Sequence, residues 1–319
     1  EWYKNTSEDL LYAVPVPEQA GVSNTTVTMN AASMNNSGFE FSATYRNRDR
    51  DFKYELSANL STLRNRVTSL GFGTDSYISG AYITNVGQEI GQFYGWAYEG
   101  IVRTQEDLDN HATQEGARIG DCLYKDVSGP DGKPDGKIDA NDQVVLGSGM
   151  PKIHFGLNAR FEYKRFDLSI ATFGALNYHV SDDIYNSLNS CYGWGNKEVG
   201  MLDANRFSED GSTYLSNVPR TYVTNSASLG WNDLFSSRKI QNAAYWKIAN
   251  VELGYNFPNE WFGKYVSDVR FYVSAQNLHT FTGYHGYNVD YAGGTFTPGY
   301  NFCSYPTART FMCGVHFTF

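Results

Sequence analysis

Alternation of apolar and polar residues runs to the last position of this chain and constrains its fold more than any other feature. At the C-terminus Phe311, Phe317 and Phe319 fall on one face of an extended segment, while Thr310 and His316 fall on the other. Similar alternation marks the ranges that we expect to be strands, namely 2–14, 36–46, 50–64, 77–86, 89–102, 151–163, 166–177, 238–257, 268–281 and 306–319. Helical periodicity is nearly absent, so the sequence predicts an all-β fold.

The connections between these expected strands alternate in length. Short ones fall at 47–49, 87–88, 164–165 and 258–267, and long ones fall at 15–35, 65–76, 103–150, 178–237 and 282–305. Barrels of the bacterial outer membrane have short turns on the periplasmic side and long loops outside the cell, and their strands turn one face to lipid and the other to a polar lumen. The pattern therefore favours a transmembrane antiparallel β-barrel over a soluble sandwich.

Charged and aromatic residues have expected places in such a barrel. The polar rows would turn charged side chains toward the lumen, namely Glu40, Arg46, Lys53, Glu55, Arg160, Glu162 and Arg270. Aromatic residues beside the short turns would form a girdle at the level of the lipid headgroups, and these are Tyr163, Phe166, Tyr255, Phe257 and Trp261. Exposed charges on a sandwich would give the same charged pattern.

Composition indicates that the chain would cross a membrane as strands. It is rich in aromatic residues, with 24 Tyr, 20 Phe and 6 Trp, but it lacks a run of about 20 apolar residues that could form a membrane helix. The net charge of -9 argues against nucleic acid, which favours clustered Lys and Arg. Because Glu1 opens the chain without an initiator Met or a signal peptide, we expect a processed or partial sequence. If these strands form only part of a barrel, the first and last strands would leave backbone groups unpaired in lipid, so they must pair with strands of another segment.

Short motifs follow one another in a specific order along the chain. They are Val86 to Gly95, Glu99-Gly100-Ile101, Gly120-Asp121, Tyr124-Lys125-Asp126, Asp135 to Asp139, Ala244 to Ile248, Leu253-Gly254-Tyr255, Ser274 to Leu278, and Tyr305 to Phe311. Together they resemble the C-terminal part of SusC/RagA-type TonB-dependent transporters. The segment Gly129 to Pro134 departs from the family pattern as an insertion ahead of Asp135, which weakens any transfer of a metal site from the family.

The resemblance implies a 22-stranded barrel in the bacterial outer membrane, with residues 1–319 forming about its last ten strands. It implies that the plug, the N-terminal half of the barrel and the link to TonB lie outside this sequence. It also implies a SusD-like surface lipoprotein as a partner and import of oligosaccharides or peptides. The alternative from a different class is a secreted or surface β-sandwich adhesin that binds glycans, and this alternative would need no detergent.

Two sets of loop residues are candidates for ligand contact. Aromatic rings near hydrogen-bonding groups suit sugar faces or peptide backbone, and the candidates are Tyr192, Trp194, Trp231, Tyr284, Tyr287 and Tyr291. The residues Asp131, Asp135, Asp139 and Asp142 match positions 1, 5, 9 and 12 of a calcium loop, although Lys133 stands where a ligand oxygen is expected. Alternatively, the rings pack within the loops or on the lipoprotein, and the Asp side chains bond the local backbone.

Motifs of the common enzyme classes are absent from the sequence. It contains no G-x-S-x-G, no G-x-x-x-x-G-K-[ST], no H-E-x-x-H and no dinucleotide fingerprint after a strand. The adjacent carboxylates Asp182 and Asp183 are expected to be solvated in a loop. We therefore expect no enzyme activity and, calcium aside, no cofactor. Whether Cys191 and Cys303 pair is left open by the sequence.

Overall fold

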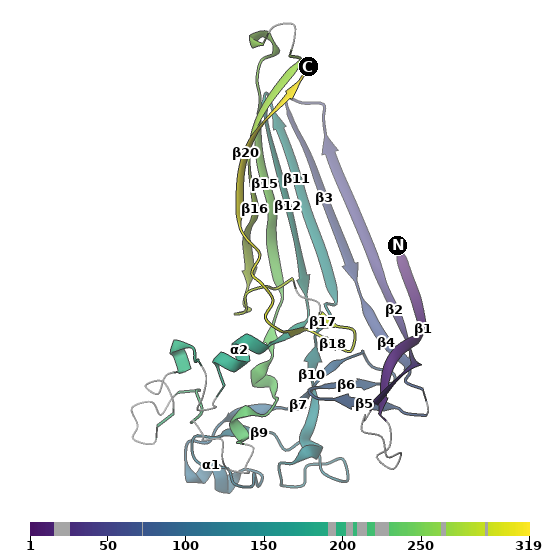
Figure 1. The fold of residues 1–319 in the computed structure, drawn as a ribbon, viewed down its shortest axis with the longest axis vertical. Helices are drawn as coiled ribbons and strands as arrows, with labels where there is room; N and C mark the ends of the chain where they lie inside the picture. The colour runs from purple at the N-terminus through teal and green to yellow at the C-terminus, as the bar shows by residue number, and fades with distance from the viewer. Residues whose placement is uncertain are drawn as a thin grey trace.

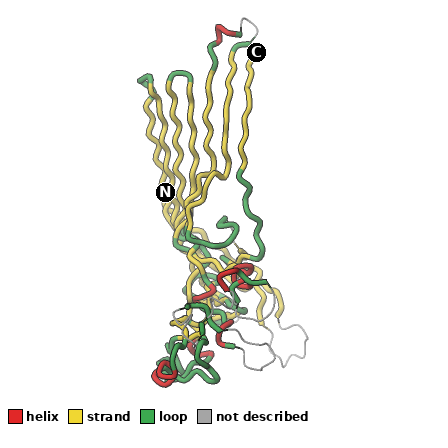
Figure 2. Tube along the Cα trace, turned by 90° about the vertical axis from the view of Figure 1, so that its left-hand side faces the viewer, coloured by secondary structure: helices red, strands yellow, loops and turns green. Residues whose placement is uncertain are grey.

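A long antiparallel sheet dominates the computed structural model, which describes residues 1–15, 26–71, 73–190, 196–201, 207–208, 216–220, 230–262, 266–290 and 293–319. The strands of this sheet are β1 (Trp2–Pro15), β2 (Thr26–Asn47), β3 (Phe52–Thr62), β4 (Arg64–Ser69), β11 (Ile153–Tyr163), β12 (Phe166–Leu176), β15 (Tyr245–Asn256), β16 (Asp268–Thr282) and β20 (Thr310–Thr318). Their spatial order is β1-β2-β3-β11-β12-β15-β16-β20, with β4 paired to β2. Figures 1 and 2 show these strands side by side as a tall wall.

The two ends of the wall differ in their connections. At one end the connections 48–51, 164–165 and 257–267 are short, and the C-terminus lies at the same end (Figure 1). At the other end the described residues of the segments 70–152 and 177–244, with part of the segment 283–309, form a loop layer below the wall. This arrangement confirms the predicted sorting of short turns and long loops. The predicted loop 15–35 is wrong in part, because its residues 26–35 belong to β2 and most of them pair with β1.

Further short elements lie in the segments that connect the wall strands. They are β5 (Ser76–Ser79), β6 (Tyr82–Asn85), β7 (Gln92–Trp96), β8 (Tyr98–Ile101), α1 (Gln105–Asn110), β9 (Cys122–Tyr124), η2 (Ala140–Asp142), β10 (Gln143–Ser148), β13 (His179–Asp182), α2 (Asp183–Leu188), η3 (Val199–Met201), η5 (Trp231–Asp233), η6 (Ser237–Lys239), β14 (Gln241–Asn242), η7 (Asn259–Trp261), β17 (Gly293–Gly294), β18 (Thr297–Pro298) and β19 (Tyr300–Asn301). Of these, β10, β7, β6 and β5 make a separate four-stranded sheet in that order.

Two of the ten predicted strands therefore do not belong to the wall. The ranges 77–86 and 89–102 form extended backbone, as predicted, but they lie in the loop layer, and residues 87–88 are not a turn of the wall. Tyr82 and Phe93 are buried there and contact each other, with ring centroids 5.2 Å apart. Among the described residues, the wall path holds eight strands.

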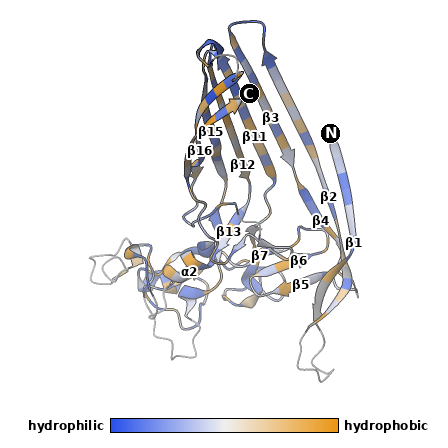
Figure 3. Ribbon diagram, turned by 45° about the horizontal axis from the view of Figure 1, so that its top comes forward, coloured by the Kyte–Doolittle hydropathy of each residue, from blue (hydrophilic) through white to orange (hydrophobic). Residues whose placement is uncertain are grey.

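The apolar rows of the wall face outward. Phe41, Leu157 and Phe311 are 61%, 46% and 69% exposed, and paired positions carry the row from strand to strand, as where Leu60 lies opposite both Phe41 and Phe155. Figure 3 shows hydrophobic and hydrophilic residues alternating along these strands. A sandwich would cover this face with a second sheet, and no described segment does so. The sandwich alternative is therefore wrong, and the outward rows form the band that meets lipid.

Among the described residues, the buried hydrophobic clusters lie toward the loop end of the molecule. One buried cluster joins the ends of β12 and β15 to the long loops, and it comprises Ala175, Tyr178, Val180, Ala243, Tyr245, Tyr284 and Val289. At the other end, aromatic rings gather beside the short turns, as predicted. The centre of the Tyr255 ring lies 4.8 Å from the centre of the Phe166 ring and 5.0 Å from that of the Phe257 ring. None of the helices in the described part of the chain is long and apolar enough to cross a membrane.

Candidate functional site

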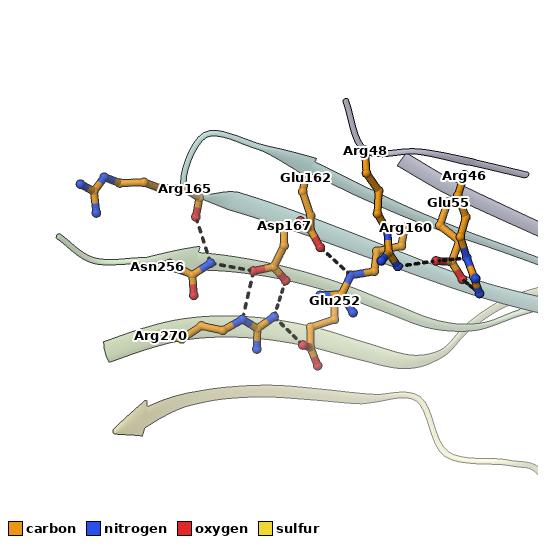
Figure 4. Close-up of polar contacts among 10 residues, drawn as sticks. All are labelled: Arg46, Arg48, Glu55, Arg160, Glu162, Arg165, Asp167, Glu252, Asn256 and Arg270. Carbon is orange, nitrogen blue, oxygen red and sulfur yellow. Dashed lines mark hydrogen bonds and ion pairs between the residues drawn. The ribbon is translucent and has the colours of Figure 1, made fainter. Parts of the chain in front are cut away.

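The polar face of the wall carries charged pairs near the short-turn end (Figure 4). Arg46 of β2 and Glu55 of β3 are directly opposite each other in the sheet, and Arg46 Nε lies 2.8 Å from Glu55 Oε2. Arg48 lies 3.5 Å from the same carboxylate oxygen. This position confirms that the predicted charged row faces away from the apolar band. Because these side chains are largely exposed, water screens each pair and its contribution to stability is small.

A small polar cavity extends this group toward β11. It has a volume of about 370 Å³ and is lined by Arg48, Lys53, Tyr54, Glu55, Arg160 and Glu162. Arg160 Nε donates to Glu162 Oε1 at 3.1 Å. With three basic and two acidic side chains lining it, this region can bind water or the charged groups of another segment.

A second charged group ties together β12, β15 and β16. Arg270 donates to both carboxylate oxygens of Asp167, at 3.0 Å from Nε and 2.5 Å from Nη2, and Nη2 also donates to Glu252 Oε1 at 2.8 Å. Asn256 adds a donor to Asp167 at 3.3 Å. Figure 4 shows this guanidinium between the two acids. A two-pronged contact of this kind fixes the geometry of three strands more firmly than the exposed pairs do.

At the loop end the polar face changes character. The Lys247 ammonium, on a residue that is only 3% exposed, donates to Asp290 of the β16–β20 loop at 2.5 Å and lies 5.8 Å from the centre of the Phe173 ring. Phe173 in turn meets Tyr245 edge to face, with ring centroids 6.1 Å apart. The loop is thus fixed to the wall by a nearly buried ion pair set among aromatic rings.

The carboxylate of Asp182 holds the long loops to one another. It accepts hydrogen bonds from the Tyr284 hydroxyl, from Asn301 Nδ2 at 2.8 Å and from the backbone N–H of Tyr185 at 2.8 Å. Burial, together with the nearby Asp182 charge, raises the pKa of Tyr284, so its hydroxyl stays protonated and donates. The expectation that Asp182 is solvated is wrong, because partners distant in sequence enclose it.

The predicted ligand-contacting aromatics lie in different surroundings. Tyr192, Trp194 and Tyr291 lie outside the described residues. Trp231 packs on Tyr124, with ring centroids 6.2 Å apart, and donates from Nε1 to the carbonyl of Glu115. Tyr284 is buried, whereas Tyr287 is 62% exposed and free to meet a ligand or partner. Trp231 and Tyr284 therefore have structural contacts of their own, and substrate contact by these residues stays a prediction.

The acidic segment closes on its own backbone. Asp139 and Asp142 form a capping box around η2, and buried Asp142 also accepts from the backbone N–H groups of Val127 and Ser128 at 2.9 and 3.1 Å. Asp135 accepts from Lys137 N at 3.0 Å, and Asp131 is exposed. No group of three His, Cys, Asp or Glu side chains in the described part of the chain is placed to hold a metal ion. Calcium binding stays a prediction.

Comparison with known proteins decides the family. No family model matches the sequence. TonB-dependent receptor P3 of Formosa agariphila is 30% identical, and the match covers 100% of this chain and 32% of the receptor. The SusC receptor of Bacteroides thetaiotaomicron is 25% identical, and the match covers 99% of this chain and 29% of that receptor. In the solved structure of the RagAB peptide transporter, the matching region covers 98% of this chain and 32% of the transporter chain, with 22% sequence identity and a TM-score of 0.76. This chain is a barrel portion of a TonB-dependent receptor of the SusC type.

Membership of this family confirms several predictions. The wall is a portion of an outer-membrane barrel, its outward apolar rows meet lipid, and the loop layer lies on the extracellular side. The chain spans about a third of the length of the curated relatives it matches. These relatives are named as receptors, so they give no sign of an enzyme, and the absence of enzyme activity stays a prediction.

Proposed function

We propose that residues 1–319 are the C-terminal part of the barrel of a SusC-like importer, whose plug and N-terminal barrel half come from the rest of the protein. The observation that carries this proposal is the continuous polar face of the wall, which runs behind the outward apolar rows from the short turns to the loop layer. Such a face supplies one side of a water-filled passage through lipid. The matched relatives, which are named as TonB-dependent receptors, support the same role.

In this proposal the loops hold oligosaccharides or peptides before the plug moves. A SusD-like lipoprotein covers the loop layer from outside the cell, and TonB acts through the N-terminal part of the protein. The loops suit this work because buried contacts, such as Lys247 with Asp290 and Asp182 with Tyr284, fix them to the wall and to each other. A preformed surface binds its ligand without the cost of ordering flexible segments.

Uptake by cells that carry the full-length protein tests this function. Growth on a peptide mixture or on an oligosaccharide mixture should depend on the gene and stop when coupling to TonB is removed. The protein should fractionate with the outer membrane, need detergent for extraction and copurify with a surface lipoprotein. Uptake that persists without TonB, or a full-length protein that is monodisperse in plain buffer, would contradict the proposal.

A further inference from the structure

A cavity of about 680 Å³ lies where the polar face of the wall meets the β16–β20 loop. Wall residues that line it are Met34, His154, Phe173, Ala175 and Tyr245, and the loop contributes Val289, Asp290, Gly293, Gly294, Thr295 and Pro298. In the sheet, Ala175 lies opposite Tyr245 and Phe173 lies opposite Lys247, so these side chains share the face that looks into the barrel. The volume is that of a small-ligand site.

The lining of this cavity is largely apolar; its polar side chains include His154 and Thr295 as well as groups that are already bonded within the protein. The Asp290 carboxylate accepts a hydrogen bond from the Lys247 ammonium at 2.5 Å. The Tyr178 hydroxyl donates to the carbonyl of Val289 at 2.9 Å. A sugar placed here would bring several hydroxyl groups into contact with rings and methyl groups, and each hydroxyl that lost its water without a new partner would cost about 1–3 kcal/mol.

We propose that this cavity receives an apolar side chain of an imported peptide, an inference that rests on the proposed import function and narrows its substrate class. The rings of Phe173 and Tyr245 meet edge to face at 84° and offer an apolar wall to an aliphatic or aromatic group. Gly293 and Gly294 at the rim pair with Pro298 and Thr297 in the two-residue ladder of β17 and β18, which holds this part of the loop in a compact turn.

Defined ligands test this proposal on the full-length transporter in detergent. Acetyl-Ala-Ala-X-Ala-Ala-amide peptides with X as Leu, Phe or Ser differ only in the side chain that would enter the cavity, and maltoheptaose serves as the sugar probe. We expect the Leu and Phe peptides to bind at least about tenfold more tightly than the Ser peptide in calorimetry. The sugar should bind more weakly than either apolar peptide.

Three variants locate the binding to this cavity. Phe173→Ala should reduce the preference for Leu over Ser to about twofold. Thr295→Phe, which changes an exposed residue at the rim, should block the cavity and weaken binding of the Leu peptide about tenfold. Phe281→Ala makes the same truncation on the lipid-facing side and should leave the preference unchanged. Folding of each variant is checked by its heat-dependent migration on a gel.

Equal binding of the Leu and Ser peptides, tighter binding of the sugar, or no binding of any peptide would overturn the inference. If peptides fail while TonB-dependent growth on oligosaccharides persists, the cavity assignment falls and the import function stands. If uptake proves independent of TonB, the import function falls, whatever the peptide preference.

Discussion

Adjacent residues Leu157 and Asn158 of β11 give the sharpest test of the two faces of the wall. Leu157 is 46% exposed on the apolar face, while Asn158 is on the polar face with Arg160. β11 has 11 residues. At about 3.3 Å per residue and a tilt of about 40°, a strand of this length spans roughly 28 Å, close to the ~25 Å height of an apolar barrel band. Leu157 is the fifth residue of the strand and so lies near the middle of the bilayer.

Introducing Arg at the two positions should therefore have unequal effects. Arg on the lipid face near the midplane costs about 2–4 kcal/mol of folding free energy, and we expect Leu157→Arg to lose that amount. Asn158→Arg should lose less than about 1 kcal/mol, because its charge reaches the polar lumen. The measurement is denaturant unfolding of the full-length protein folded into lipid vesicles. Equal losses, or a larger loss for Asn158→Arg, would refute the assignment of the faces.

Four further predictions follow from individual contacts. Arg270→Gln should destabilise the barrel by about 2–3 kcal/mol in the same unfolding assay, because two partly buried acids lose their cation, whereas Arg160→Gln removes an exposed pair and should cost under about 1 kcal/mol. Burial lowers the pKa of His179 in the folded protein, so folding favours the neutral imidazole. The stability that this gives the loops is complete above the ordinary His pKa of about 6.5 and should fall as the pH drops from there toward the lower folded pKa. Hydrogen exchange of β13 at pH 7 and at pH 5 would measure this loss. Millimolar calcium should give heat on titration of the native protein but not of Asp142→Asn, and no heat from either contradicts a calcium site. Tyr287→Ala should weaken substrate binding, and unchanged affinity would remove this exposed ring from the site.

The sequence predicts the wall well because each strand separates two solvents. Lipid on one side and water on the other require a period of two, and the paired rows through Phe41, Leu60 and Phe155 keep it. The same period cannot tell which sheet a strand joins. The segments around Tyr82 and Phe93 alternate as the wall strands do, but the two rings are buried in the loop layer. The prediction of extended backbone for 77–86 and 89–102 is therefore confirmed, but the prediction that these ranges are strands of the wall is wrong.

The cavity residues were missed although the sequence carried a signal for one of them. Phe166, Leu168 and Ile170 form the outward row of β12, and Phe173 is out of phase with that row. An aromatic residue on the polar face of a barrel strand has no lipid to meet, so it must pack on a loop or a ligand. Asp182 had no comparable signal, because its partners Tyr284 and Asn301 lie 102 and 119 residues away along the chain.

The strands β12, β15 and β16 separate two roles along their length. Near the short turns they are joined by Arg270 with Asp167 and Glu252, a contact that holds the barrel together. Near the loops, β12 and β15 present Phe173 and Lys247 to the cavity and to Asp290. Substitutions in the first group should change unfolding more than ligand affinity, and substitutions around the cavity should do the reverse. Since both groups lie on the same face of the same strands, a difference in outcome reflects depth along the barrel.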